Sequence, residues 1–97
     1  MATYIAMIQF TQQGLETIDQ SPARAEAFTA AAEKLGASVR KIFWTTGAVD
    51  GLVSIDAPDE ATAAAAFLAL SRDGNVKTQM LRAYDRSEFQ QLLDSLS

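Results

Sequence analysis

The order of the apolar segments is the feature that most constrains how this chain can fold. Short runs rich in aromatic and branched residues predict strands at 3–10, 39–46, 52–57 and 76–84. Apolar residues at three- and four-residue spacing predict helices after the first and third of these strands, and another at the C-terminus. The order β-α-β-β-α-β followed by a helix is typical of a ferredoxin-like α+β sandwich with a four-stranded antiparallel sheet.

Polar residues mark the expected helix starts. Ser21 is expected to cap the first helix through its hydroxyl, and Gly36 to end it. The acidic pair Asp59–Glu60 opens the second helix, where carboxylates favour the positive end of the helix dipole, so we interpret it as a cap and not as a metal site. Asp85 and Glu88 have the spacing of a capping box before the third helix.

The charged residues support the strand order of this fold, in which the first and third strands are central. The two expected central strands contain no Lys or Arg, whereas the expected edge strands carry Arg40, Lys41, Lys77 and Arg82. Charges on edge strands discourage unwanted pairing with other chains. The charge pattern therefore agrees with the apolar pattern.

Both faces of the first strand are apolar. One face carries Tyr4, Ala6, Ile8 and Phe10, and Ile5 and Met7 alternate onto the other. Two helices cover only one face of a four-stranded sheet, and a domain of 97 residues has a limited core. We expect the same face of a second copy to cover the other side, giving a homodimer or higher oligomer of the dimeric α+β barrel type. The alternative is that the C-terminal helix folds back over it.

The composition excludes several kinds of chemistry and partner. The chain contains no histidine and no cysteine, which excludes Ser-His-Asp and Cys-His catalysis, imidazole or thiolate zinc sites and disulfides. A net charge of −4 with scattered basic residues argues against nucleic-acid binding. No apolar run approaches the roughly 20 residues that cross a bilayer, and no secretory signal is visible. We expect one cytoplasmic domain over 1–97 without cofactor, metal or membrane.

Five residues are candidates for a site. Asp50, in a glycine-flanked turn between two strands, is the candidate general base, although a turn aspartate more often accepts backbone hydrogen bonds. Tyr4 and Trp44, with Tyr84, are candidate walls for a flat ligand, and Arg82 is a candidate anchor for an anion. The alternatives are aromatic packing at an interface and an edge-strand charge.

Several blocks of this sequence resemble the GYD-domain family. They are Thr-Tyr-Ile at 3–5, Gln-Phe-Thr-Gln-Gln-Gly at 9–14, Phe-Trp-Thr-Thr-Gly-Ala-Val-Asp-Gly-Leu-Val at 43–53, and Gly-Asn-Val-Lys-Thr-Gln-Met-Leu-Arg-Ala-Tyr at 74–84. The resemblance runs from Thr3 to Phe89 and implies a dimeric α+β barrel without an established activity. Val49 stands where the family's Gly-x-Tyr-Asp turn has its tyrosine, so any role of that phenol is absent here.

These observations lead to three functional hypotheses. The first is a small homo-oligomeric binding protein that holds a small molecule in a cleft at the sheet face. The second is a cofactor-independent enzyme, monooxygenase- or isomerase-like, with Asp50 as base; the wider dimeric-barrel group, which includes such oxygenases, suggests it by analogy of fold. The third is a structural interaction module without a ligand. The first is favoured, because no convergent set of catalytic groups is visible.

Overall fold

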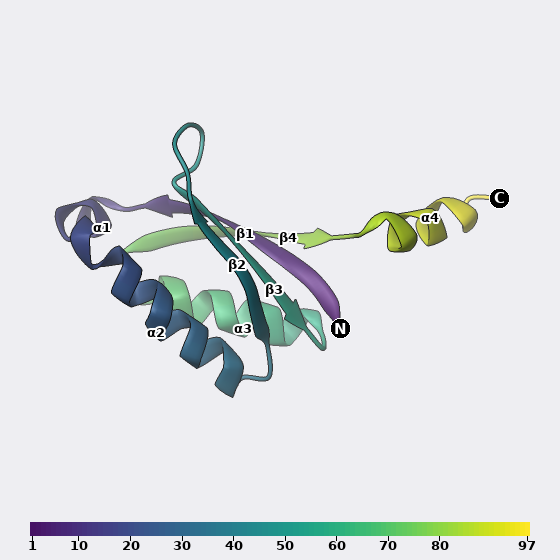
Figure 1. The fold of residues 1–97 in the computed structure, drawn as a ribbon, viewed down its shortest axis with the longest axis horizontal. Coiled ribbons are helices and arrows are strands. Elements are labelled where there is room, and N and C mark those ends of the chain that lie inside the picture. The colour runs from purple at the N-terminus through teal and green to yellow at the C-terminus, as the bar shows by residue number, and fades with distance from the viewer.

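The computed structural model describes residues 1–97, and its strands form a single antiparallel sheet (Figure 1). The strands are β1 (Ala2–Phe10), β2 (Ser38–Trp44), β3 (Gly51–Ala57) and β4 (Val76–Ala83). They pair in the order β2-β3-β1-β4, so β1 and β3 are central. The predicted ferredoxin-like α+β topology is confirmed, and the strands that carry Lys and Arg are the two edge strands.

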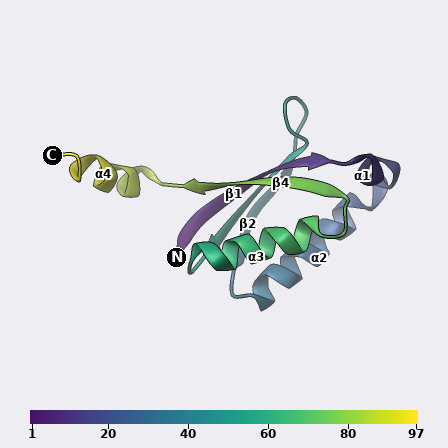
Figure 2. The same ribbon diagram turned by 180° about the vertical axis from the view of Figure 1, so that it is seen from behind.

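Two helices, α2 (Ser21–Lys34) and α3 (Glu60–Ser71), cover one face of this sheet (Figures 1 and 2). The core lies between them and the sheet. Small side chains bring the helices close to the strands, since Ala32, Ala63 and Ala66 are completely buried. The rings of Phe28 and Phe67 stack with their centroids 6.1 Å apart and join α2 to α3. Of the face of β1 that carries Tyr4, Ala6, Ile8 and Phe10, the first three residues are buried, so this is the face that packs against the helices.

Two of the three predicted caps are confirmed. The Asp59 carboxylate accepts a hydrogen bond of 2.7 Å from the Thr62 backbone N–H at the start of α3. Asp85 and Glu88 form the capping box of α4 (Arg86–Asp94), with N···O distances of 2.8 and 3.0 Å. In both cases a carboxylate satisfies an N–H group that the first helical turn leaves unpaired.

The predicted cap at Ser21 is wrong. Ser21 is already helical, because a 3-10 turn, η1 (Ile18–Gln20), leads directly into α2. The Ser21 backbone N–H donates a hydrogen bond to the Ile18 carbonyl of this turn. The Ser21 hydroxyl instead accepts a hydrogen bond from the Trp44 indole. The predicted stop at Gly36 is confirmed by its φ of 96°, which favours glycine.

A short helix, α1 (Gln12–Glu16), and η1 were not expected between β1 and α2. α1 begins at Thr11, whose hydroxyl accepts a hydrogen bond of 3.1 Å from the Gly14 backbone N–H. The helix has five residues, which is too few for an apolar repeat to be visible in the sequence.

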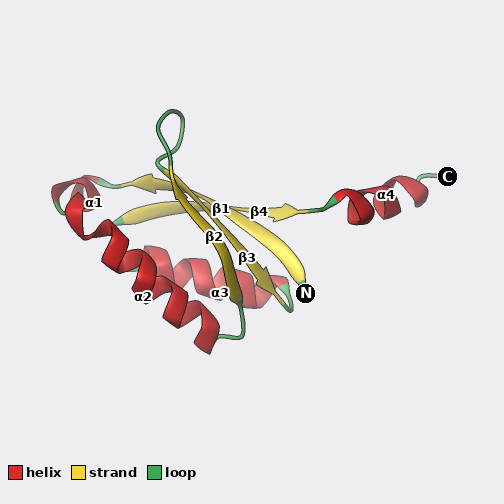
Figure 3. Ribbon diagram, in the orientation of Figure 1, coloured by secondary structure: helices red, strands yellow, loops and turns green.

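The C-terminal helix α4 projects beyond the end of the sheet and covers neither of its faces (Figures 1, 2 and 3). The alternative in which it folds back over the second face is therefore wrong. Its large apolar side chains are exposed, with Phe89 53% and Leu92 42% accessible. None of the helices has both the length and the apolar character that spanning a membrane would demand.

Candidate functional site

A cleft of about 270 Å³ opens on the helix-covered side of the sheet, between α2, the end of α3 and the sheet. Thirteen of its 20 lining residues are hydrophobic. Alanines occupy four positions where larger side chains would fill the space, namely Ala25, Ala27 and Ala31 on α2 and Ala69 on α3. The stacked ring of Phe28 is part of its wall. An apolar hollow with a few polar groups is the usual form of a small-molecule site.

Trp44, a predicted ligand-binding residue, lines this cleft. Its indole N–H donates a hydrogen bond of 2.9 Å to the Ser21 hydroxyl at the start of α2, so the ring is held between strand and helix. The indole nevertheless stays 51% accessible. As expected from strand alternation, Phe43 points to the opposite face of the sheet, where its partner across the strands is Leu52.

Asp50, the predicted general base, also lines the cleft. One carboxylate oxygen accepts a hydrogen bond of 2.8 Å from the Phe10 backbone N–H, and the Asp50 N–H donates to the Ile8 carbonyl at 2.8 Å. Both contacts join the loop to the end of β1, where the pairing of β1 with β3 stops. The carboxylate thus caps a strand 40 residues away in the chain, whereas the sequence suggested a cap within its own turn.

Arg24 was not singled out by sequence reasoning, yet it lies at the same cleft. Its Nη2 donates a hydrogen bond to the Thr17 hydroxyl, whereas its Nη1 is buried without a hydrogen-bond partner. The sequence feature that could have identified Arg24 is its position one helical turn before Phe28, which places a charge beside the apolar side of α2. The lining also includes one further arginine, Arg72, at the end of α3.

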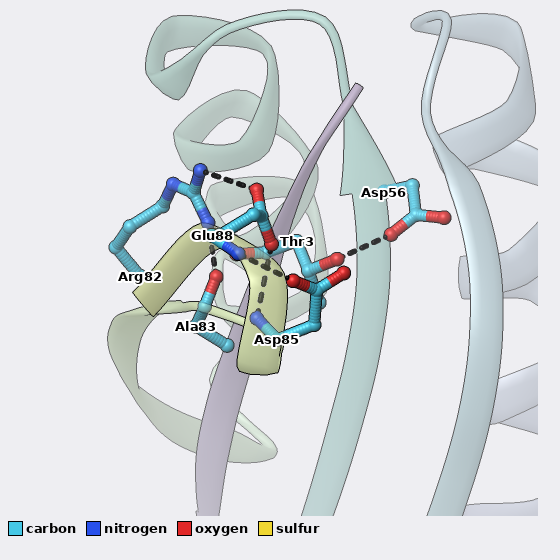
Figure 4. Close-up of polar contacts among 6 residues, drawn as sticks. All are labelled: Thr3, Asp56, Arg82, Ala83, Asp85 and Glu88. Atoms are coloured by element: carbon cyan, nitrogen blue, oxygen red, sulfur yellow. Dashed lines mark hydrogen bonds and ion pairs between the residues drawn. The ribbon is translucent and has the colours of Figure 1, made fainter. Parts of the chain in front are cut away.

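Tyr4 and Arg82 lie together but outside the cleft. The Arg82 guanidinium lies 5.6 Å from the centre of the Tyr4 ring and 4.3 Å from that of Tyr84. It also donates to the carbonyl of Ala83 and forms an ion pair with Glu88 at 3.3 Å (Figure 4). The structure therefore does not bring these two residues together with Trp44, and protein groups already engage the cation.

The other face of the sheet is open and carries an apolar stripe across all four strands. Strand register places Phe43 opposite Leu52, Leu52 opposite Met7, and Ile5 opposite Leu81. We call these five residues, Phe43, Leu52, Met7, Ile5 and Leu81, the sheet stripe. Two of its members are prominently accessible, Phe43 at 54% and Leu81 at 42%.

Polar residues border the sheet stripe. Asp56 accepts a hydrogen bond of 2.8 Å from the Thr3 hydroxyl (Figure 4) and lies 3.6 Å from Arg40 of the edge strand. Lys41 faces Ser54 across β2 and β3, and Lys77 lies at the start of β4. The face is thus mixed, with an apolar centre and charged ends, as many protein-binding surfaces are.

Comparison with known proteins gives two matches. A family model described as the GYD domain matches residues 4–93, which include the cleft, the sheet stripe and all but the last residue of α4. A Thermus thermophilus protein named "Glutamine synthetase and cystathionine beta-lyase binding protein" is 33% identical over 84 residues. That alignment covers 86% of this chain and 88% of the relative.

Proposed function

This chain belongs to the GYD-domain family, and we propose that it is a small homo-oligomeric binding protein whose targets are other proteins. The observation that carries the proposal is the sheet stripe, which none of the helices covers. Contiguous apolar surface of this kind on a soluble domain marks an interaction site.

A second copy is the occupant that we assign to the sheet stripe. The stripe crosses both central strands and both edge strands, so two sheets related by a twofold axis bring the same residues into contact. Two faces packed at the usual spacing of about 10 Å would bury Leu52 and Met7 at the centre of the contact. Lys41 and Asp56 on the same face supply opposite charges to the second copy.

We assign the enzyme target to α4. This helix projects from the domain with Phe89, Leu92 and Leu93 exposed, and helices with one apolar side commonly bind in a groove of another protein. The relative from Thermus thermophilus is named for binding glutamine synthetase and cystathionine beta-lyase, so these two enzymes are the first targets to test.

The oligomer is tested by light scattering during gel filtration at about 50 µM, a concentration at which micromolar assemblies are formed. The wild type is expected at a multiple of 10.4 kDa. Leu52→Glu is expected to give the monomer, because it places a charge in the centre of the contact. The matched control is Leu68→Glu on the outer side of α3, where the side chain is 67% exposed. A wild-type monomer, or an unchanged Leu52→Glu oligomer, would contradict the proposed self-association.

Enzyme binding is tested with purified glutamine synthetase and cystathionine beta-lyase from the same source organism as this chain. Calorimetry is expected to show saturable binding to at least one of them, lost in Leu92→Glu and retained in Leu68→Glu. If neither enzyme binds the wild type, enzyme targeting is wrong. If Leu92→Glu binds as the wild type does, the assignment to α4 is wrong.

Catalysis in the cleft is a second candidate function, favoured by the presence of both Asp50 and Trp44 in its lining. Asp50 would serve as general base and Trp44 as a wall for an aromatic or enolisable substrate. This function predicts that Asp50→Asn abolishes turnover while stability falls only by the roughly 1 kcal/mol expected from the weakened hydrogen bond to the Phe10 N–H. If Asp50→Asn loses stability but keeps turnover, Asp50 is a strand cap and not a base. If the cleft holds no ligand at all, the remaining interpretation is a structural interaction module.

A further inference from the structure

Arg24 carries the one buried side-chain nitrogen or oxygen in the protein that has no hydrogen-bond partner, its Nη1. The neighbouring Nη2 donates to Thr17, which fixes the guanidinium, and no carboxylate of the chain forms an ion pair with it. A charged N–H group that is buried without an acceptor is unfavourable, because it has lost water and gained nothing in exchange. Such a group is therefore a strong donor toward any acceptor that enters beside it.

The cleft beside Arg24 is otherwise apolar. Phe28, Ile42 and Leu70 line it, and Trp44 forms an exposed part of the wall. A ligand that satisfies both features has an acceptor at one end and an apolar body at the other. At about 270 Å³ the cleft falls just below the roughly 300–1,000 Å³ of pockets for drug-sized molecules, which points to a small compound.

We propose that this cleft binds a small monocarboxylic acid with an aromatic or branched aliphatic body. Its carboxylate accepts hydrogen bonds from Arg24, and its body packs against Phe28 and Trp44. A single guanidinium matches the charge and planar geometry of a carboxylate. A phosphate dianion is disfavoured by the rest of the lining, where one further cation, Arg72, stands against two carboxylates, Asp50 and Asp73.

The carboxylate site is independent of the proposed protein contacts. The cleft lies on the helix-covered side of the sheet and the sheet stripe on the other, and Phe43 at the edge of the sheet is the one residue that belongs to both. The helix α4 lies beyond the end of the sheet (Figures 1 and 2). A result that contradicts self-association or enzyme binding therefore does not contradict the carboxylate site. Failure of the carboxylate site likewise does not contradict those two proposals.

Trp44 provides the measurement, because it is the only tryptophan and lines the cleft. Its fluorescence is followed while benzoate, 3-phenylpropionate or 4-methylpentanoate is added to the wild-type chain. At least one acid is expected to give a saturable change, and the corresponding neutral amide is expected to bind at least about tenfold more weakly, since it lacks the charge that Arg24 recognises.

Substitutions distinguish recognition of the acid by Arg24 from a general effect of the protein's charge on binding. Arg24→Met retains the apolar stem and is expected to weaken binding of the acid at least about tenfold, whereas Arg24→Lys retains part of the affinity. Arg86→Met, the same change on exposed α4, is the matched control and is expected to bind as the wild type does. Circular dichroism checks that each variant is folded, and the comparison of acid with amide needs no variant.

Three results would each overturn the proposal. The first is that none of the three acids gives a saturable response below about 10 mM, a concentration far above that of specific binding. The second is equal affinity for an acid and its amide. The third is a folded Arg24→Met that binds the acid as tightly as the wild type.

Discussion

The indole of Trp44 donates a hydrogen bond to the hydroxyl of Ser21, which joins the end of β2 to the first turn of α2 at the mouth of the cleft. This contact links two segments 23 residues apart in the chain. It gives the serine a role in tertiary structure in place of the capping role that its position before Pro22 indicated. It also fixes the orientation of the largest ring in the cleft.

Ser21→Ala should lower the free energy of unfolding by about 0.5–1.5 kcal/mol, the usual net value of one hydrogen bond. Urea denaturation measures this loss. The Trp44 emission should also move to longer wavelength, because a ring released from Ser21 is better solvated. Ser87→Ala on exposed α4 is the control and should change neither quantity. Unchanged stability and emission in Ser21→Ala would show that this contact does not hold the ring.

Removal of the Asp50 carboxylate should destabilise the end of β1. Asp50→Ala leaves the Phe10 N–H without its acceptor and should cost about 1–3 kcal/mol, whereas Asp50→Asn keeps an oxygen there and should cost about 1 kcal/mol. Urea denaturation gives both values. Amide hydrogen exchange at Phe10 should accelerate more than at Ala6 in the middle of β1. Equal exchange at the two amides would contradict the strand-cap role.

Acid should weaken the start of α3. The backbone N–H of Thr62, followed by its side chain, holds the pKa of Asp59 below its ordinary value of 3.8. Since the pKa is lower in the folded state, the ionised cap stabilises the fold above about pH 4 and loses this effect as the pH falls through the folded-state pKa. Asp59→Asn keeps a capping oxygen that does not titrate.

The comparison of these two proteins is therefore made at pH 7 and pH 2.5. Thermal melting should show a larger loss of stability on acidification in the wild type than in Asp59→Asn. Equal losses would mean that ionisation of Asp59 does not matter for the fold.

Glu88 should anchor α4 mainly through the capping box. Glu88→Gln removes the ion pair with Arg82 but keeps an oxygen for the Asp85 N–H, and because the pair is partly exposed its loss should cost less than about 1 kcal/mol. Glu88→Ala removes both contacts and should increase amide exchange in the first turn of α4. Similar exchange in the two variants would contradict the larger role of the capping box.

Most of the fold could be predicted because its elements are long and periodic. Alternation in β1 grouped Tyr4 and Ile8 on one face, which is the buried one, and the positions of Lys and Arg identified the edge strands. The direction of α4 could not be predicted, since Leu92 and Leu93 mark an apolar side without saying what it contacts. The sequence likewise gave no sign of η1, which displaced the expected cap at Ser21.

The candidate site was less accessible to sequence reasoning. Alternation placed Trp44 and Phe43 on opposite faces, but only the contact with Ser21 identifies Trp44 as the one beside α2. Arg24 resembles any other helical arginine in the sequence. Its importance depends on burial and on the lack of an acceptor for Nη1, which are properties of the folded chain.

The alanines that line the cleft make its size adjustable without a change of fold. A leucine at Ala31 or Ala69 would extend into the hollow, gain apolar contacts and leave the sheet, Arg24 and the helix ends as they are. Family members that differ at these positions would then differ in whether they hold a small molecule at all, while keeping the same surfaces for other proteins. Side-chain size at a few helical positions would thus separate family members that bind a small molecule from members that bind only other proteins.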